Sequence, residues 1–309
     1  MDYASVNRGR MHACGHDGNM AVTLGAAKIL AGYRDELQGN IKVIVQPSEE
    51  NTGGAARIIQ SGGLEDPRVD AIVTPHIWAE LPNGRIGLRK GAVMASSDLF
   101  HIRIKGVPGH GAWPHQAVDP IPIAAEVITA LQRLVSREVD PMKACVLSIG
   151  RIQGGTAENI ISETVEIHGT IRAFEESVRS HLEKRLREVT EGLAQAGRAA
   201  CEITYRRVMP PVSNHPELVD FATAALHKVF PADTITADYP LTMGCEEFSL
   251  FQQIIPGIFL LIGNQKPEEA MIPIHSPGFL WHEENLVKGI KALSVIALEY
   301  TGTPFRVKD

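Results

Sequence analysis

Residues 41–50 read IKVIVQPSEE, a β-branched run that ends in a proline turn and two adjacent glutamates. The run Ile41–Val45 predicts a buried strand, because β-branched residues pack well in a sheet. A helix is predicted around residues 55–60 and a further short strand at residues 71–73. Strand, helix and strand in this order are typical of an α/β sheet, in which ligands bind beyond the carboxyl ends of the strands.

The segments on either side extend the same pattern. A helix is predicted from His16 to about Leu30. Beyond residue 211 the sequence predicts a helix at 216–229, a buried strand at 257–262 and a closing helix at 284–300. We therefore expect residues 1–98 and 212–309 to form one α/β domain, with a mixed sheet and helices on both faces.

The middle region, residues 99–211, follows a different pattern. Its predicted order is strand, helix, strand, strand, helix and strand, which is the order of a ferredoxin-like (βαββαβ) α+β sandwich. Asp119-Pro120 marks the start of its first helix as N-cap and first-turn proline. Along the predicted strand 164–172, Val165 and Ile171 share one face and Arg172 lies on the other. We expect this sandwich to be inserted into the α/β domain with a core of its own.

Composition restricts the class of protein. The 309 residues are 44% apolar and 21% charged, with a net charge of -6 and no basic block. This charge argues against nucleic acid or an anionic membrane as a partner. The apolar stretches are too short to span a bilayer, and the N-terminus shows no secretory signal. With four scattered cysteines and no disulfide framework, we expect a cytoplasmic globular enzyme.

Histidine stands out, because several of the twelve histidines sit beside Gly, Pro or acidic residues in predicted turns. Neutral imidazole is the commonest metal ligand in proteins. Four motifs lie at predicted strand ends or helix starts: residues 12–17 (HACGHD), 46–50 (QPSEE), 74–78 (TPHIW) and 274–278 (IHSPG). Taken singly, each has an ordinary structural explanation, such as a glycine turn, an acidic loop or a hydrogen-bonded histidine.

Taken together, the motifs indicate a metal site. Five candidate ligands exceed the needs of one tetrahedral ion, and a carboxylate can bridge two ions. Two-metal hydrolases activate a water between such ions. The candidate ligands are Cys14, His16, Glu50, His76 and His275.

The whole chain resembles the M20 metallopeptidases, specifically the M20D amidohydrolase subgroup that contains hippurate hydrolases and auxin-conjugate (IAA-amino acid) hydrolases. Besides HACGHD, QPSEE and Pro75–Trp78, the resemblance rests on further ordered motifs. These are residues 109–115 (GHGAWPH), 154–159 (GGTAEN), 169–172 (GTIR) and 275–277 (HSP).

The resemblance implies a metallopeptidase-like fold and a role for each motif. It makes Cys14, His16, Glu50, His76 and His275 the ligands of two divalent ions per subunit, which could be Zn, Mn, Ni or Co. It makes Glu49 the general base and His110 an oxyanion-stabilising histidine that reaches the partner subunit's site. Asn159 and Arg172 match positions that bind the substrate's backbone and carboxylate. Residues 99–211 correspond to the family's lid and dimerisation domain, which implies a homodimer.

The chain departs from the family's pattern at two places. Family members usually carry a longer segment before the HACGHD motif, with two early strands and an Asp-x-Asp segment, so this chain is expected to lack the usual N-terminal segment. Residues 243–248 read MGCEEF where relatives commonly have Gly-Gly-Glu-Asp-Phe. Cys245 in this motif could disturb the packing near the site or could be a spare thiol.

The implied reaction is hydrolysis of the amide bond of an N-acyl amino acid, of the hippurate, N-acetyl or aryl-acyl type. Metal-activated water would attack while Glu49 takes its proton and returns it to the departing amine. Two alternatives remain: an aminopeptidase or dipeptidase of the same family, and a catalytically impaired metal-binding fragment. The resemblance is also compatible with carboxypeptidase activity. A Cys14-nucleophile hydrolase is disfavoured, since it would leave Glu49, Glu50, His76 and His275 without a role.

Overall fold

The computed structural model describes residues 4–51, 53–237 and 239–303, and its chain divides into two compact units. Unit 1 comprises the chain up to Val93, residues 213–240, and the chain from Leu250 onward. Unit 2 comprises residues 94–212 and 241–249. Residues 241–249 were expected in the α/β domain. They belong to unit 2, where Ala95 N donates to the carbonyl oxygens of Thr242 and Gly244.

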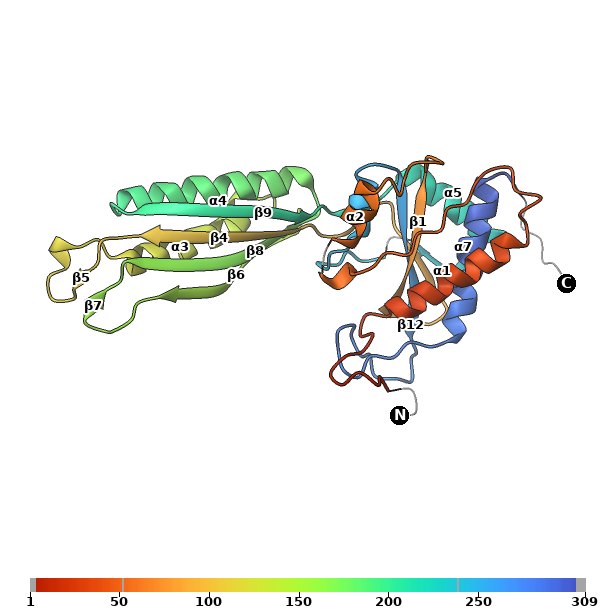
Figure 1. Ribbon diagram of the computed structural model, residues 1–309, viewed down its shortest axis with the longest axis horizontal. Helices are drawn as coiled ribbons and strands as arrows, with labels where there is room; N and C mark the ends of the chain where they lie inside the picture. Colours follow the sequence, from red (N-terminus) through yellow and green to blue (C-terminus); the bar gives the residue numbers. More distant parts are fainter. Residues whose placement is uncertain (1–3, 52, 238, 304–309) are drawn as a thin grey trace. The chain divides into compact units, whose positions relative to one another are not determined.

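Unit 1 is built on a mixed four-stranded sheet with the order β1-β12-β2-β11. β1 and β12 run parallel, β12 and β2 run antiparallel, and β2 and β11 run parallel. The long pair β1 and β12 joins segments that lie far apart in the sequence (Figure 1). The bounds are β1 Ile72–Pro82, β2 Ile86–Leu88, β11 Ile235–Ala237 and β12 Gly257–Gln265.

Three long helices cover one face of this sheet. They are α1 (His16–Ala31), α5 (Pro216–His227) and α7 (Glu284–Tyr300). Their apolar side chains share one core with alternate residues of β12, among them Ile258 and Ile262. The short α2 (Gly54–Gln60) lies on the opposite side of β1 from α5 and α7 (Figure 1). The mixed α/β architecture predicted from the sequence is confirmed.

The strand predicted at Ile41–Val45 is wrong. This segment has no strand pairing within the described residues, and Val43 and Val45 are exposed. It is held instead by Lys42, whose Nζ donates to the carbonyl oxygens of Gly63 at 3.2 Å and Pro67 at 2.9 Å. A β-branched run forms a strand only where a neighbouring strand accepts its backbone and a core covers its side chains.

Unit 2 contains an antiparallel four-stranded sheet with the order β6-β8-β4-β9. Two long helices, α3 and α4, pack against it (Figure 1). The bounds are β4 Ser97–Lys105, α3 Pro120–Arg133, β6 Cys145–Gly154, β8 Thr164–Ala173, α4 Glu176–Ala196 and β9 Ala200–Met209. A small two-stranded sheet pairs β5 (Gly109–His110) with β7 (Ile160–Ile161).

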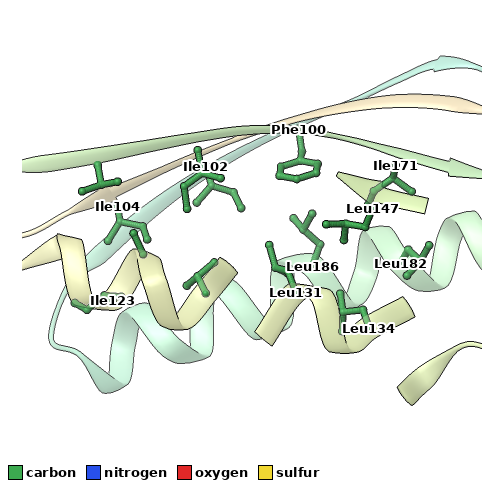
Figure 2. Close-up of a cluster of buried hydrophobic side chains, with 14 of the residues drawn as sticks. Phe100, Ile102, Ile104, Ile123, Leu131, Leu134, Leu147, Ile171, Leu182 and Leu186 are labelled. Carbon is green, nitrogen blue, oxygen red and sulfur yellow. The ribbon is translucent and has the colours of Figure 1, made fainter. Parts of the chain in front are cut away.

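The core of unit 2 lies between one face of this sheet and the two helices (Figure 2). Phe100, Ile102 and Ile104 of β4 meet Leu131 of α3 and Leu186 of α4 there. As predicted, Asp119 caps α3, with its carboxylate accepting from Ile121 N at 3.0 Å. Every second residue of β8 is buried, and Arg172 lies on the other face.

The remaining elements are short. They are η1 Glu49–Asn51, β3 Gly91–Met94, η2 Pro114–Gln116, η3 Leu134–Glu138, β10 Val212–Asn214, η4 Ala232–Thr234 and α6 Phe248–Gln252. None of the helices in the described residues combines the length and the apolar character needed to cross a membrane.

Candidate metal centre

The motif HACGHD forms the turn that begins α1. Gly15 occupies the N-cap position at φ 80°, a left-handed conformation that glycine adopts without steric cost. Cys14 precedes it and is buried, and His16 is the first residue of the helix. The turn therefore places a thiol and an imidazole two residues apart at the same helix end.

His76 reaches these residues from β1. The sequence predicted it in a turn after a strand at residues 71–73, and this is wrong, because β1 continues to Pro82 with His76 opposite Leu261 of β12. Pro75 lies within this strand, opposite Leu260 of β12. Proline is tolerated here because β1 is at the edge of the four-stranded sheet, where a missing N–H need not break the ladder.

The environment of His76 keeps its imidazole neutral and aims one nitrogen at Cys14. Its Nδ1 donates to the carbonyl oxygen of Ile77 at 2.7 Å, so Nε2 carries the lone pair, 3.8 Å from Cys14 Sγ. Burial, and then the neighbouring His16, lower the pKa of His76 to about 4. The rings of His16 and His76 lie edge to face, with their centroids 5.4 Å apart. A buried neutral imidazole of this kind is suited to metal ligation.

The two glutamates of QPSEE approach different histidines. Glu50 Oε1 lies 3.0 Å from His275 Nε2, whereas Glu49 Oε2 lies 3.8 Å from His16 Nε2. Ser48 and His275 both adopt positive φ, at 59° and 63°. The amide of His275 donates to the carbonyl oxygen of Ala13, which ties this loop to the turn before α1.

The donor atoms gather into two overlapping sets. Cys14, His16 and His76 form one, Cys14, Glu50 and His275 form the other, and within each set the ligand atoms lie within 4.8 Å of one another. The two sets share Cys14. His16 Nε2 is buried and has no hydrogen-bond partner, so its lone pair is available to bind a metal ion. Thiolate, imidazole and carboxylate donors are those that zinc and related ions bind, so the residues fit a metal centre.

A supporting layer, which the sequence analysis did not identify, fixes this cluster. Gly18 lets α1 lie directly on β1, since a Cβ there would fall 2.3 Å from Ile77 Cδ1. Asn19 Oδ1 accepts from Ile77 N at 2.9 Å, and Trp281 Nε1 donates to Asp17 Oδ1 at 3.2 Å. The available signal was that Gly18-Asn19 follows HACGHD directly, where a helix interior seldom places glycine.

The remaining predicted site residues belong to unit 2. His110 pairs with Ile160 in the small sheet, and the carbonyl oxygen of Asn159 accepts from Gly111 N at 2.8 Å. Arg172 lies near the far end of β8, where its Nη1 donates to the carbonyl oxygen of Met243 at 3.0 Å. Within unit 2, His110 and Asn159 are therefore neighbours, and Arg172 is separated from them by most of a strand.

Comparison with known proteins gives consistent matches. The model of "Peptidase family M20/M25/M40" matches residues 1–299. The chain is 37% identical to the IAA-amino acid hydrolase ILR1-like 4 of Arabidopsis thaliana, over 97% of this chain and 68% of that protein. It is also 37% identical to an N-acetylcysteine deacetylase of Bacillus subtilis, over 97% of this chain and 77% of that protein.

Among solved structures, the chain is similar to the YXEP protein of Bacillus subtilis, described as a dinuclear metal binding peptidase from the M20 family. The TM-score is 0.83 at 33% identity, with 98% of this chain and 77% of that chain covered.

Proposed function

The chain belongs to peptidase family M20/M25/M40 and is a hydrolytic enzyme, and we propose that it cleaves the amide bond of N-acyl amino acids. One observation carries this proposal. Five metal-ligating side chains from four separate segments converge at one end of α1, in two sets that share Cys14. The proposed ligands of two divalent ions are Cys14, His16, Glu50, His76 and His275.

Glu49 is the proposed general base. Divalent ions held by these donors would supply an activated water, since binding to such an ion lowers the pKa of water toward neutral pH. Glu49 is not a member of either donor set that contains Cys14. Its Oε2 atom lies 3.8 Å from Nε2 of His16, which is a member of one of these sets. From there it can accept a proton and return it to a leaving amine, while Glu50 serves as a ligand.

Arg172 and Asn159 are the proposed contacts to the substrate's carboxylate and backbone. The Arg172 guanidinium uses Nη1 for the Met243 carbonyl, which fixes the orientation of the planar group. A fixed guanidinium matches a carboxylate better than a lysine ammonium would, because it can donate two parallel hydrogen bonds.

The separation of His110 from Arg172 favours a homodimer. β8 rises by about 3.4 Å per residue, so the eight steps along the chain from Thr164 to Arg172 span roughly 27 Å. One small N-acyl amino acid cannot touch both ends of that strand within one unit 2. We therefore propose that residues 99–211, as a ferredoxin-like lid, dimerise the chain and offer His110 to the oxyanion in the partner subunit's site.

The dimer can be tested by mixing inactive variants. His110→Ala and Glu49→Gln proteins, inactive alone, should regain activity when mixed, because one heterodimer site then combines an intact base with an intact histidine. No recovery despite demonstrated subunit exchange would place His110 outside the partner's site.

The substrate class rests on what the relatives' names have in common. An IAA-amino acid hydrolase and an N-acetylcysteine deacetylase both act, by their names, on an amino acid whose amine carries an acyl group. The test is metal analysis of the purified chain beside a hydrolysis panel of N-acetyl, N-benzoyl and dipeptide substrates. Turnover of acylated amino acids supports the proposal, turnover of dipeptides alone replaces it with a peptidase, and bound metal without turnover contradicts it.

A further inference from the structure

A second group of histidines and carboxylate lies in unit 2, outside the centre around Cys14. His101 of β4 stands directly opposite His168 of β8 in the antiparallel register, and Glu166 is two residues before His168. All three alternate with core residues such as Ile102 and Ile167. α3 and α4 cover the core side of this sheet (Figure 2). Because side chains alternate between the two faces of a strand, the three side chains project from the other face.

The ligand atoms of the three side chains lie close together. The imidazole rings of His101 and His168 are stacked, with centroids 4.2 Å apart and planes at 5°. Glu166 Oε2 lies 3.7 Å from His101 Nε2 and 3.8 Å from His168 Nε2. These distances are too long for hydrogen bonds, and both Nε2 atoms are buried without a hydrogen-bond partner. Two enclosed nitrogens and a carboxylate oxygen thus lie within 4.8 Å of one another without hydrogen bonds between them.

Neighbouring charges hold the carboxylate in place. Arg103 donates to Glu166 Oε1 from Nε at 3.0 Å and from Nη2 at 2.6 Å, which turns Oε2 toward the two imidazoles. Outer groups that orient a ligand in this way are a regular part of metal sites. Glu202 pairs with Lys105 and lies 3.8 Å from Arg103. The charges of Arg103 and Lys105 balance those of Glu166 and Glu202, so these four groups add no net positive charge beside the imidazoles.

We propose that His101, Glu166 and His168 form a further binding site, for a divalent cation of the zinc and nickel class. Imidazole and carboxylate donors suit these ions, and three protein ligands leave a fourth position for water. Two donors each about 2.05 Å from a tetrahedral ion lie roughly 3.3 Å apart. The observed Nε2–Oε2 separations of 3.7 and 3.8 Å are close to this value, and because imidazole lone pairs lie in the ring planes, the two stacked rings must turn about χ2 when both bind one ion. A bound ion would cross-link the central strands β4 and β8.

The site can be tested on the full chain by zinc stoichiometry. Metal-stripped protein is titrated with zinc chloride by equilibrium dialysis, for the wild type and for a His101→Gln/His168→Gln double variant. The matched control is His181→Gln, which removes a half-exposed histidine of the same unit whose Nε2 faces one carboxylate, Glu138, at 3.5 Å. The double variant should bind one zinc fewer per chain than the wild type, and the control should bind the same amount. Equal stoichiometry in all three proteins overturns the proposal.

A second measurement avoids any substitution. Wild-type crystals soaked in micromolar zinc should give an anomalous difference peak between His101 Nε2 and His168 Nε2. Absence of that peak, or a peak that appears only at millimolar zinc, overturns the proposal. Because neither measurement uses hydrolysis, the result is independent of whether the chain cleaves N-acyl amino acids.

Discussion

Unit 1 and unit 2 each gather histidines and carboxylates, but on different kinds of backbone. In unit 1 the donors come from a helix end, a 3-10 turn, a strand and a loop, and Gly15, Ser48 and His275 hold positive φ. In unit 2 the donors stand on two adjacent strands in regular register. A site built from loops depends on the tertiary structure of the whole unit, whereas a site built on paired strands depends only on their register.

This contrast bears on what each arrangement can do. Strained loop positions persist only where the surrounding structure fixes them, and such positions cluster at functional sites. The buried His76 and the loop-borne Glu49 give unit 1 both a lone-pair donor and a proton acceptor near one point. The strand cluster of unit 2 offers donors only. We accordingly propose the unit 1 centre, and not the strand cluster, as the site of hydrolysis.

The largest effect should come from separating the two adjacent glutamates of unit 1. Glu49→Gln should reduce kcat by about 10²–10⁴-fold while metal content stays at the wild-type level, because a general base needs a titratable carboxylate. Glu50→Ala should lower metal content, since Glu50 is the member that lies within a donor set with Cys14 and His275. Steady-state kinetics beside metal analysis measures both. Equal metal loss in the two variants would contradict the proposal that Glu50 is a metal ligand and Glu49 is not.

The next largest effect concerns a buried ion pair in unit 2. Asp98 and Arg179 are almost fully buried, and Arg179 Nε donates to Asp98 Oδ2 at 2.9 Å. Arg179→Met should destabilise the protein by about 3–5 kcal/mol, because it leaves the Asp98 carboxylate buried without its cation. Urea unfolding measures the change.

The control is Arg207→Met, which removes a half-exposed arginine that pairs with Glu183 and Glu176 of α4. Exposed pairs contribute about 0–1 kcal/mol, so this variant should unfold close to the wild type. An equal decrease in the free energy of unfolding for both variants would show that burial does not decide how much these ion pairs stabilise the protein.

Much of unit 2 could be predicted from the sequence because its strands alternate cleanly and its helices carry clear stripes. Phe100, Ile102 and Ile104 alternate along β4 and all reach the core, and Asp119 caps its helix as predicted. The Asp98–Arg179 pair could not be predicted, since a charged residue beside the apolar stripe of a helix is usually exposed. The pairing of His101 with His168 across two strands could not be predicted either, because alternation shows which face of a strand a residue lies on but not the register between strands.

Unit 1 was harder to predict, because its strand pairs join distant segments. Ile41–Val45 has the composition of a strand but finds no partner in the described residues, and β1 continues past Pro75 because it pairs with β12. The ligand positions came from ordered motifs and their resemblance to a family. The periodicity of the sequence could not show that Cys14 belongs to both donor sets, because this depends on how four segments of the chain meet in space.

A smaller effect should appear in acid, and only in the metal-free protein. The pKa of His76 is lowered to about 4 by burial, against about 6.5 in the unfolded chain, so between these values the unfolded state binds more protons. Stability should therefore fall as pH decreases from about 6.5 to 4, by up to about 3 kcal/mol.

The comparison of wild type with His76→Gln isolates this contribution from other acid effects. After chelation, urea unfolding across this pH range should show a shallower decline for His76→Gln than for the wild type. Parallel curves for the two proteins would mean that His76 titrates normally in the fold.

The smallest effect contrasts two helical glycines, one under the metal centre and one in unit 2. Gly18 of α1 leaves no room, since a Cβ would lie 2.3 Å from Ile77 Cδ1 and 3.0 Å from the Trp281 ring, whereas a Cβ at Gly192 of α4 meets nothing within 4 Å. Gly18→Ala should cost about 1–3 kcal/mol through overpacking, and Gly192→Ala should stabilise by about 0.4–1 kcal/mol through helix propensity. Because Gly18 positions α1 against β1, its variant should also bind metal more weakly. Thermal melts with metal titration measure both quantities. Stabilisation by Gly18→Ala would show that the contact of α1 with β1 can relax, and that the loop-built centre is less dependent on its surroundings than the strand-built cluster.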